Sequence, residues 1–409
     1  MSLAGPFHRL AWSNLVAQSA EQLSIAAAPM VAVLALGAGA GETGFLTAAQ
    51  TLPFLLLSFP AGVLADRLPR RGLMVSAELV RAAALLSLPV LAAFGWLSVP
   101  LLAIIGFVAA TGTVAYSVAA PALVPALVPR ASLAAANGRL ELARSVAYAA
   151  GPALAGTLVG WAGASPAFTL AAMLSGVAVV LLVGVPEPPR RAPAARHFGR
   201  ELQEGAAFAW THRFLRPIFL TAVFWNLSWF ILQAAYVPYA VHVLGLSASA
   251  IGTSLAAYGV GMLVGALLAA RLMRSLSIGM AIAMGPLVSV AAAAVMVATL
   301  WHPSPLLMGA SFFLFGAGPI LWTISQTTLR QTVTPDALLG RVSALFMTAS
   351  AGARPIGAAI GGAVGAAAGP EAAILLAALG FMVQALVIIW SPVPRLARLP
   401  DRAERLTAA

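Results

Sequence analysis

The sequence predicts an all-α integral membrane protein with twelve transmembrane helices in two pseudo-symmetric six-helix halves. The chain of 409 residues is 61% hydrophobic and only 9% charged, so one soluble core could not bury its apolar residues. Twelve apolar runs approach or exceed the roughly twenty residues that span a bilayer. They cover 11–36, 44–65, 72–94, 101–124, 137–160, 166–185, 217–244, 250–270, 278–300, 304–329, 342–366 and 371–390.

The positions of the basic residues predict the topology. All 23 are arginine, and in the connections they occur before the first run and after every second run. The intervening connections, near Gly41, Trp96, Gly163, Gly245, Pro303 and Gly369, carry none. The positive-inside rule places the basic connections and both termini in the cytoplasm, and we expect a multi-pass protein of the bacterial inner membrane. Because the net charge of +11 is spread over short loops, it does not indicate nucleic-acid binding.

Several classes of function are excluded by composition. The chain has no cysteine and only five scattered histidines, so no metal site or cofactor is expected. No nucleophile and base occur together at one depth, and no phosphate-binding glycine loop is present, so neither an enzyme nor ATP hydrolysis is expected. The first run is too long for a signal peptide and carries Glu21, which indicates a retained helix.

One hydrophilic stretch, 186–216, divides the chain nearly in half. We expect an N-terminal half at 1–185, a linker at 186–216, a C-terminal half at 217–392 and a cytoplasmic tail at 393–409. The linker contains an amphipathic helical pattern, with Phe198, Leu202, Ala206 and Ala209 opposite Arg200, Glu201 and Glu204. The halves also contain similar segments, because 64–70 (LADRLPR) matches 268–274 (LAARLMR) and Pro152 matches Pro355 at nearly the same offset. Such duplication is typical of transporters.

The segment 62–71, GVLADRLPRR, resembles the loop signature of the major facilitator superfamily. Residues 147–156 resemble the fifth-helix motif of the antiporter branches of this superfamily. Residues 121–138, 328–341 and 352–362 are similar to the branch of enterobactin-type siderophore exporters and macrolide-efflux proteins. The resemblance covers the whole chain and implies alternating access. This chain departs from the family pattern at Pro69, where a glycine is usual, and it lacks the arginine that drug-proton antiporters carry in 101–121.

The signature loop is expected to control gating. Small residues at Gly62 and Ala65 would let two helices pack closely, and Asp66 would pair with Arg70 or a helix N-terminus in one conformation only. The gating candidates are Gly62, Asp66, Arg67, Arg70 and Arg71, and the alternative is that the arginines only enforce topology. A second motif of small residues and prolines would let helices pack closely. This packing would be purely structural, or it would also form the surface on which the two halves move during transport. The residues are Gly151, Pro152, Gly156, Pro355, Gly357 and Gly361.

Ionisable residues deep in the apolar runs are candidates for proton coupling or substrate contact, because burying a charge in a membrane is unfavourable. They are Glu21, Arg144 and Arg354. Glu21 would carry a proton, or it would form a structural pair with Arg354. Two further pairs, Glu78 with Arg81 and Arg139 with Glu141, are nearer the cytoplasmic end and are expected to be solvated or snorkelling ion pairs.

Polar and aromatic residues in 217–244 and 304–329 recur at helical spacing and would complete a cavity, or would serve only for packing. They are Trp225, Asn226, Trp229, Gln233, Tyr236, Trp322 and Gln326. The sequence thus favours a monomeric secondary transporter in the lipid bilayer, exporting a small organic molecule, a siderophore or a drug-like compound, in exchange for protons. An importer of a small solute, a non-transporting receptor and a membrane-embedded enzyme are the alternatives.

Overall fold

The computed structural model describes residues 5–129, 132–187 and 198–399, which contain helices and no β-strand. The helices of the first part are α1 (Gly5–Leu36), α2 (Ala40–Arg67), α3 (Arg70–Ala93), α4 (Val99–Leu127), α5 (Leu133–Ala162) and α6 (Ala164–Val183). They are followed by α7 (Phe198–Thr211), α8 (Leu215–Pro238), α9 (Ala248–Ser275), α10 (Ile278–Ala298), α11 (Pro305–Val333), α12 (Asp336–Ala368) and α13 (Pro370–Ile389). A π-helical turn, η2 (Tyr239–Val243), extends α8, and a 3₁₀ turn, η3 (Val393–Arg395), follows α13.

The twelve predicted spans are confirmed as α1 to α6 and α8 to α13, and a helix, α7, forms where the amphipathic pattern was found. The largest differences in where the helices begin are at α1 and α12, which start at Gly5 and Asp336 and not at 11 and 342. The turns before the predicted starts contain charged residues, so hydrophobic periodicity does not reveal them. Nine of the described helices are long and apolar enough to cross a membrane by length and composition. The other three of the twelve, α2, α5 and α12, pack among them.

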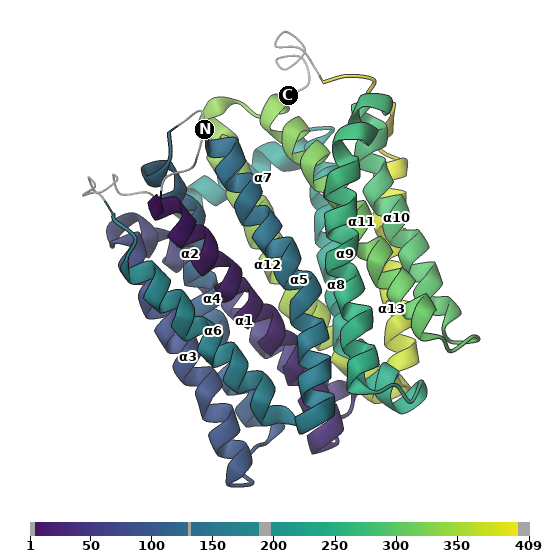
Figure 1. The fold of residues 1–409 in the computed structure, drawn as a ribbon. Coiled ribbons are helices and arrows are strands. Elements are labelled where there is room, and N and C mark those ends of the chain that lie inside the picture. Colours follow the sequence, from purple (N-terminus) through teal and green to yellow (C-terminus); the bar gives the residue numbers. More distant parts are fainter. Residues whose placement is uncertain (1–4, 130–131, 188–197, 400–409) are drawn as a thin grey trace.

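Helices α1 to α6 form one group and α8 to α13 a second, and the two groups lie side by side (Figure 1). In the first group α1 packs on α5 and α6, and α3 packs on α4 and α6. In the second group α8 packs on α12 and α13, and α10 packs on α11 and α13. Across the boundary the main contacts are α2 with α12 and α5 with α9. These contacts are equivalent, because the second helix of each group meets the fifth helix of the other.

The linker helix α7 packs mainly on α12 of the second group. Gly205 lies directly against the backbone of Arg341, where a Cβ atom would have no room, and Glu204 forms an ion pair with the Arg341 side chain. Since α7 also contacts α8, the linker helix is attached to the second group.

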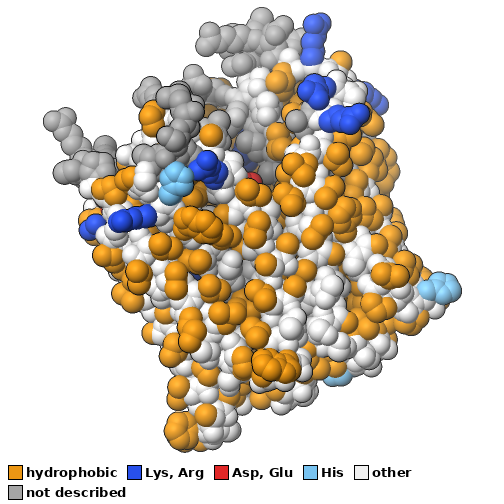
Figure 2. All heavy atoms as spheres, viewed as in Figure 1, with side chains coloured by type: hydrophobic (Ala, Val, Ile, Leu, Met, Phe, Trp, Pro, Cys, Tyr) orange, Lys and Arg blue, Asp and Glu red, His pale blue; other side chains and the backbone are white. Residues whose placement is uncertain are grey.

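The start of α1 and the turn η3 after α13 lie at the same end of the bundle (Figure 1), and arginine side chains gather at this end on the visible face (Figure 2). We term it the arginine-rich end. The helix ends that point to this side carry Arg9, Arg67, Arg70, Arg71, Arg271, Arg274 and Arg341. On the face visible in Figure 2, the surface between the two ends carries many hydrophobic side chains and few charged ones, as a lipid-facing surface requires. That the arginine-rich end faces the cytoplasm stays a prediction.

Candidate substrate cavity and buried charges

A cavity of about 530 Å³ lies between the two helix groups and is lined by residues from both. The first group contributes Glu21, Gln22, Ile25, Ala26, Pro29, Thr47, Gln50, Thr51, Phe54, Arg144, Tyr148 and Pro152. The second contributes residues of α8 to α13, among them Trp225, Trp229, Tyr258, Trp322 and Arg354. This volume is within the usual range for small-molecule sites.

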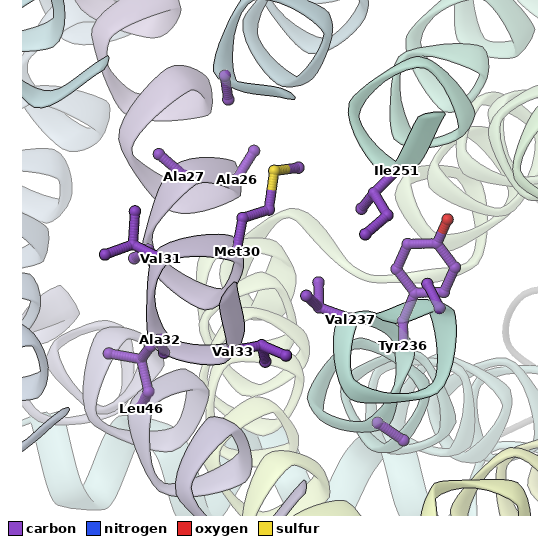
Figure 3. Packing of buried hydrophobic residues seen from close by; sticks show 14 of the residues in the cluster. Ala26, Ala27, Met30, Val31, Ala32, Val33, Leu46, Tyr236, Val237 and Ile251 are labelled. Carbon is purple, nitrogen blue, oxygen red and sulfur yellow. The ribbon is translucent and has the colours of Figure 1, made fainter. Parts of the chain in front are cut away.

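Close backbone contacts close the cavity toward the end of the bundle opposite the arginine-rich end, which we term the arginine-poor end. A Cβ atom on Gly44 of α2 would lie 2.3 Å from Cα of Gly362 of α12. The equivalent contact joins α5 and α9, where a Cβ atom on Gly156 would lie 2.3 Å from the Ala248 carbonyl oxygen. Apolar packing continues this closure, and Figure 3 shows Met30 of α1, which is fully buried, pointing toward α8 and α9.

The faces that line the cavity are open toward the arginine-rich end. Met347 lies two turns before Arg354 on the same face of α12 and is 54% exposed. The Glu141 side chain, one turn before Arg144 on α5, is 49% exposed. The structure therefore has a central cavity that is closed at the arginine-poor end and accessible from the arginine-rich end.

Aromatic residues of the second group form one wall of the cavity. The rings of Trp225 and Trp229 stack at 5.5 Å with an interplanar angle of 12°, and Trp229 also packs on Tyr258 at 5.0 Å. Trp225 donates a hydrogen bond to Ser289 at 3.2 Å. Such rigid aromatic surfaces suit flat or apolar ligands.

Six of the seven predicted cavity residues line this space: Trp225, Asn226, Trp229, Gln233, Tyr236 and Trp322. Gln326 does not line it, because its side chain is buried and donates to the Thr327 hydroxyl at 2.9 Å. The sequence analysis missed Tyr148, Tyr258, Phe54 and Phe312, which lie on four different helices. Tyr148 lies four residues after Arg144 on α5, so helical spacing could have suggested it, whereas the sequence carries no comparable signal for Phe54, Tyr258 and Phe312.

Two of the three predicted deep charges face the cavity without a direct partner. The carboxylate of Glu21 and the guanidinium of Arg354 form no ion pair or hydrogen bond with any described residue, and they are not paired with each other. Arg354 is instead held between two aromatic rings, with its Cζ 5.2 Å from the centroid of Phe54 on α2 and 5.8 Å from that of Phe230 on α8. Arg354 thus contacts both groups.

Arg144 lies at the rim of the cavity and is paired. Its Nη2 and Nε donate to Glu141 at 2.6 and 3.0 Å, which neutralises the charge locally. The expected pairing of Arg139 with Glu141 is wrong, because Arg139 contacts the His8 imidazole at 3.1 Å instead. On a helix, residues two apart lie on different faces, whereas Glu141 and Arg144 are three apart.

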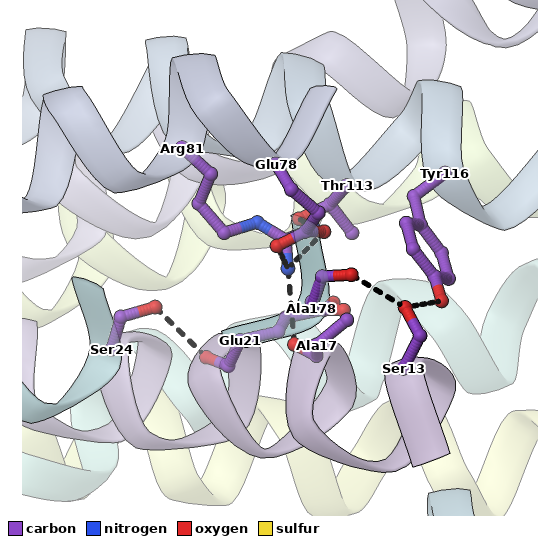
Figure 4. Close-up of polar contacts among 9 residues, drawn as sticks. All are labelled: Ser13, Ala17, Glu21, Ser24, Glu78, Arg81, Thr113, Tyr116 and Ala178. Atoms are coloured by element: carbon purple, nitrogen blue, oxygen red, sulfur yellow. Dashed lines mark hydrogen bonds and ion pairs between the residues drawn. The ribbon is translucent and has the colours of Figure 1, made fainter. Parts of the chain in front are cut away.

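The expectation that Glu78 and Arg81 form a solvated pair is also wrong. Their side chains are 0% and 2% exposed, and Arg81 Nη1 lies 3.0 Å from Glu78 Oε1. Arg81 also donates to the Ala17 carbonyl oxygen at 3.0 Å and to the Thr113 hydroxyl at 2.9 Å (Figure 4). The prediction used only the position of the two residues along the helix. It failed because α3 directs both side chains toward α1 and α4 and not toward lipid or water.

The signature loop lies at the arginine-rich end, between α2 and α3. The Asp66 side chain lies outside the described part of the structure, so its predicted pairing stays a prediction. Close packing at Gly62 is not found, because a Cβ atom there would meet nothing within 4 Å, whereas Ala65 is buried. Arg67 ends α2 and is exposed.

A carboxylate from another segment occupies the N-terminus of α3. Glu187, which follows α6, accepts hydrogen bonds from the backbone N–H groups of Arg70 at 2.7 Å and Arg71 at 2.8 Å. The Arg70 side chain donates to the Ala122 carbonyl oxygen, and that of Arg71 to the Val185 carbonyl oxygen at 3.3 Å. These contacts connect helices within the first group. A carboxylate at a helix N-terminus is favourable.

The residues of the small-residue motif lie at helix contacts. Gly156 meets α9 across the boundary, Gly151 meets Gln22 of α1, and Gly357 and Gly361 lie against the α8 backbone. Pro152 lines the cavity, and Pro355 is buried next to Arg354 in the chain.

Comparisons with known proteins agree with this architecture. The family model of the Major Facilitator Superfamily matches residues 10–353 and, in an overlapping match, 227–408. The multidrug efflux pump Tap of Mycobacterium tuberculosis is 26% identical over 98% of this chain and 96% of its own. Macrolide efflux protein A of Enterococcus faecalis is 26% identical over 53% of this chain and 68% of its own.

Among solved structures, that of the nucleoside transporter NupG superposes with a TM-score of 0.77 at 10% identity, covering 94% of this chain and 98% of that one. At this identity the likeness concerns the fold alone. The family match covers most of the chain, and the two helix groups enclose a central cavity. The chain therefore belongs to the major facilitator superfamily of membrane transporters.

Proposed function

We propose that this protein is a proton-coupled exporter of a small organic molecule that works by alternating access. The likeness to two relatives, a macrolide efflux protein and a multidrug efflux pump, supports export. In this proposal the protein acts as a monomer in the bacterial inner membrane, with the arginine-rich end and both termini in the cytoplasm. Residues 1–185 and 217–392 are the rocking halves, joined by the linker 186–216 and followed by the tail 393–409.

The observation that carries the proposal is the central cavity. It has about 530 Å³ of space, is accessible from the arginine-rich end, and joins an aromatic wall to an unpaired carboxylate. A cavity open to the cytoplasm is suited to collect substrate for export. The stacked Trp225 and Trp229 favour an aromatic or apolar substrate of drug-like size.

We assign the coupling to Glu21, which lines the cavity and can exchange a proton with it. Arg354 and Arg144 contribute to substrate recognition or to the field at Glu21. Asp66, with Gly62, Arg67, Arg70 and Arg71, controls the balance of conformations at the arginine-rich end. The glycines at the α2–α12 and α5–α9 contacts provide the smooth surfaces on which the halves rock.

Transport into inside-out membrane vesicles tests this proposal. We expect an acidic vesicle interior to drive accumulation of at least one probe from a set of three: a macrolide, an aromatic cationic dye and an aromatic catecholate. Glu21→Gln should insert normally but abolish accumulation driven by the pH gradient, because the proton carrier is gone. Glu42→Gln is the matched control, because Glu42 is exposed and caps α2, and a glutamine keeps that cap.

Two results would contradict the proposal. Uptake of the probes only into right-side-out vesicles would indicate an importer. Accumulation by Glu21→Gln at the parent rate, with unchanged pH dependence, would remove Glu21 from the coupling mechanism.

A further inference from the structure

We infer that Glu21 and Glu78 form a shared proton-binding site in which Arg81 balances only one of the two carboxylates. This inference rests on the proposed proton coupling and names the site that stores the proton. It involves two residues, Glu78 and Arg81, that do not line the substrate cavity. The site formed by Glu21, Glu78 and Arg81 would bind a single proton.

The first step of the argument is the position of Arg81 relative to Glu21. Arg81 Nη1 donates to the Ala17 carbonyl oxygen at 3.0 Å. Ala17 and Glu21 are four residues apart on α1 and share one face. Figure 4 shows Arg81, Glu78 and Thr113 gathered over this face. The guanidinium of Arg81 is thereby held one helical turn from the base of the Glu21 side chain.

The second step is a small internal space of about 30 Å³ that both Glu21 and Arg81 line. It is large enough to hold one water molecule. Nε of Arg81 has no hydrogen-bond partner in the described structure. Glu21 lines both this space and the substrate cavity, so it connects them. The order from the cavity inward is Glu21, the small space, Arg81 and Glu78.

The third step is a count of charges. Arg81 contacts Glu78 at 3.0 Å and faces Glu21 across the small space, so one guanidinium serves two carboxylates. Two ionised carboxylates with one guanidinium would leave an unbalanced negative charge, and Glu78, whose side chain is 0% exposed, has no contact with water that could screen it. Like charges sharing a buried site are unfavourable, and one retained proton removes the imbalance. The proton then belongs to the pair of carboxylates and not to either residue alone.

Other polar and charged groups around the cluster do not change this count. Tyr116 of α4 lies beside the cluster, and its hydroxyl is hydrogen-bonded to Ser13 at 3.2 Å (Figure 4). On the cavity side of Glu21 lie Tyr148 and Arg144 of α5 and Arg354 of α12, of which Arg144 is paired with Glu141. Arg354 is held between the rings of Phe54 and Phe230 and forms no ion pair with Glu21, so it is not counted as the partner of either carboxylate.

Arg354 gives this site its connection to transport. Glu21, Glu78 and Arg81 belong to the first helix group and keep their relative positions when the groups rock. Arg354 belongs to the second group, so its distance to Glu21 changes between conformations. A cation that moves away from Glu21, or that is neutralised by a bound anionic ligand, strengthens proton binding at the shared site.

Infrared spectroscopy of the lipid-reconstituted protein at pH 7 tests the site without requiring a substrate. We expect a carbonyl stretching band of one protonated carboxyl group. Both Glu21→Gln and Glu78→Gln should abolish this band, because Arg81 alone balances whichever carboxylate remains. Glu42→Gln, which changes an exposed carboxylate, should leave the band intact. Arg81→Gln, if it folds, should roughly double the band, because both carboxylates then take up a proton.

Each alternative predicts a different result. A band that survives Glu78→Gln places the proton on Glu21 alone, a band that survives Glu21→Gln places it on Glu78 alone, and no band in the parent means a fully ionised cluster. Any of these outcomes overturns the inference. If the band behaves as expected while vesicles show no transport driven by the pH gradient, the shared site stands and the proposed coupling fails.

Discussion

Replacing Gly44 with alanine should shift the protein away from the conformation described here. The new Cβ atom would lie 2.3 Å from Cα of Gly362 and 2.9 Å from the Ala358 carbonyl oxygen, both of them backbone atoms of α12. Backbone cannot move aside as a flexible side chain can. Overpacking of this kind costs about 1–3 kcal/mol. The substitution should penalise only the state in which α2 and α12 are in contact at the arginine-poor end.

The expected magnitude follows from that difference between states. A penalty of about 1–3 kcal/mol on one of two conformations changes their ratio by about 5- to 150-fold. The gain in helix propensity from glycine to alanine applies equally to both conformations and cancels. Gly156→Ala, at the equivalent α5–α9 contact, should produce the same shift.

Distances between paired spin labels would measure this redistribution. Because the chain has no cysteine, labelling sites can be introduced without background. Trp161 and Leu306, each 84% exposed, lie at the arginine-poor end on opposite groups, and Leu68 and Gly340 serve the arginine-rich end. The first distance should lengthen and the second shorten in the Gly44→Ala variant.

A control separates this effect from a general response to alanine. Gly176→Ala changes a helical glycine whose Cβ atom would meet nothing within 4 Å, and it should leave both distances unchanged. If Gly44→Ala shows the same distance distributions as the parent, the glycine contacts do not decide which end is closed.

Three further predictions concern other parts of the chain. Asp66→Asn should slow turnover while substrate affinity in detergent is kept, and unchanged spin-label populations across the arginine-rich end would make Asp66 only structural. Glu21→Gln and Arg354→Gln should change thermal stability additively to within about 0.5 kcal/mol, because no direct pair joins the two residues, and mutual rescue in the double variant would contradict this. His212 is buried and accepts N–H bonds from Phe214 and Leu215, and burial lowers its pKa. As the pH falls below about 6.5, the unfolded chain therefore binds a proton at His212 before the folded chain does, and thermal stability should fall. An asparagine side chain accepts the same hydrogen bonds without titrating. His212→Asn should therefore reduce this dependence of thermal stability on pH.

The sequence by itself determined the spans, because twenty apolar residues in a row leave few alternatives to a membrane helix. It also identified much of the cavity wall. Trp225 and Trp229 are four residues apart, so any helix places them on one face, and the face rich in aromatic residues proved to line the cavity.

Only the tertiary structure decided which helix lies opposite each face. Glu78 and Arg81 are sealed because α1 and α4 cover them, and Arg354 is unpaired because Phe54 and Phe230, from two other helices, enclose it. Gln326 has the same spacing from Trp322 as Trp229 has from Trp225, yet it turns away from the cavity. Helical periodicity relates residues within one helix, whereas the partner of a buried charge depends on packing between helices that are distant in sequence.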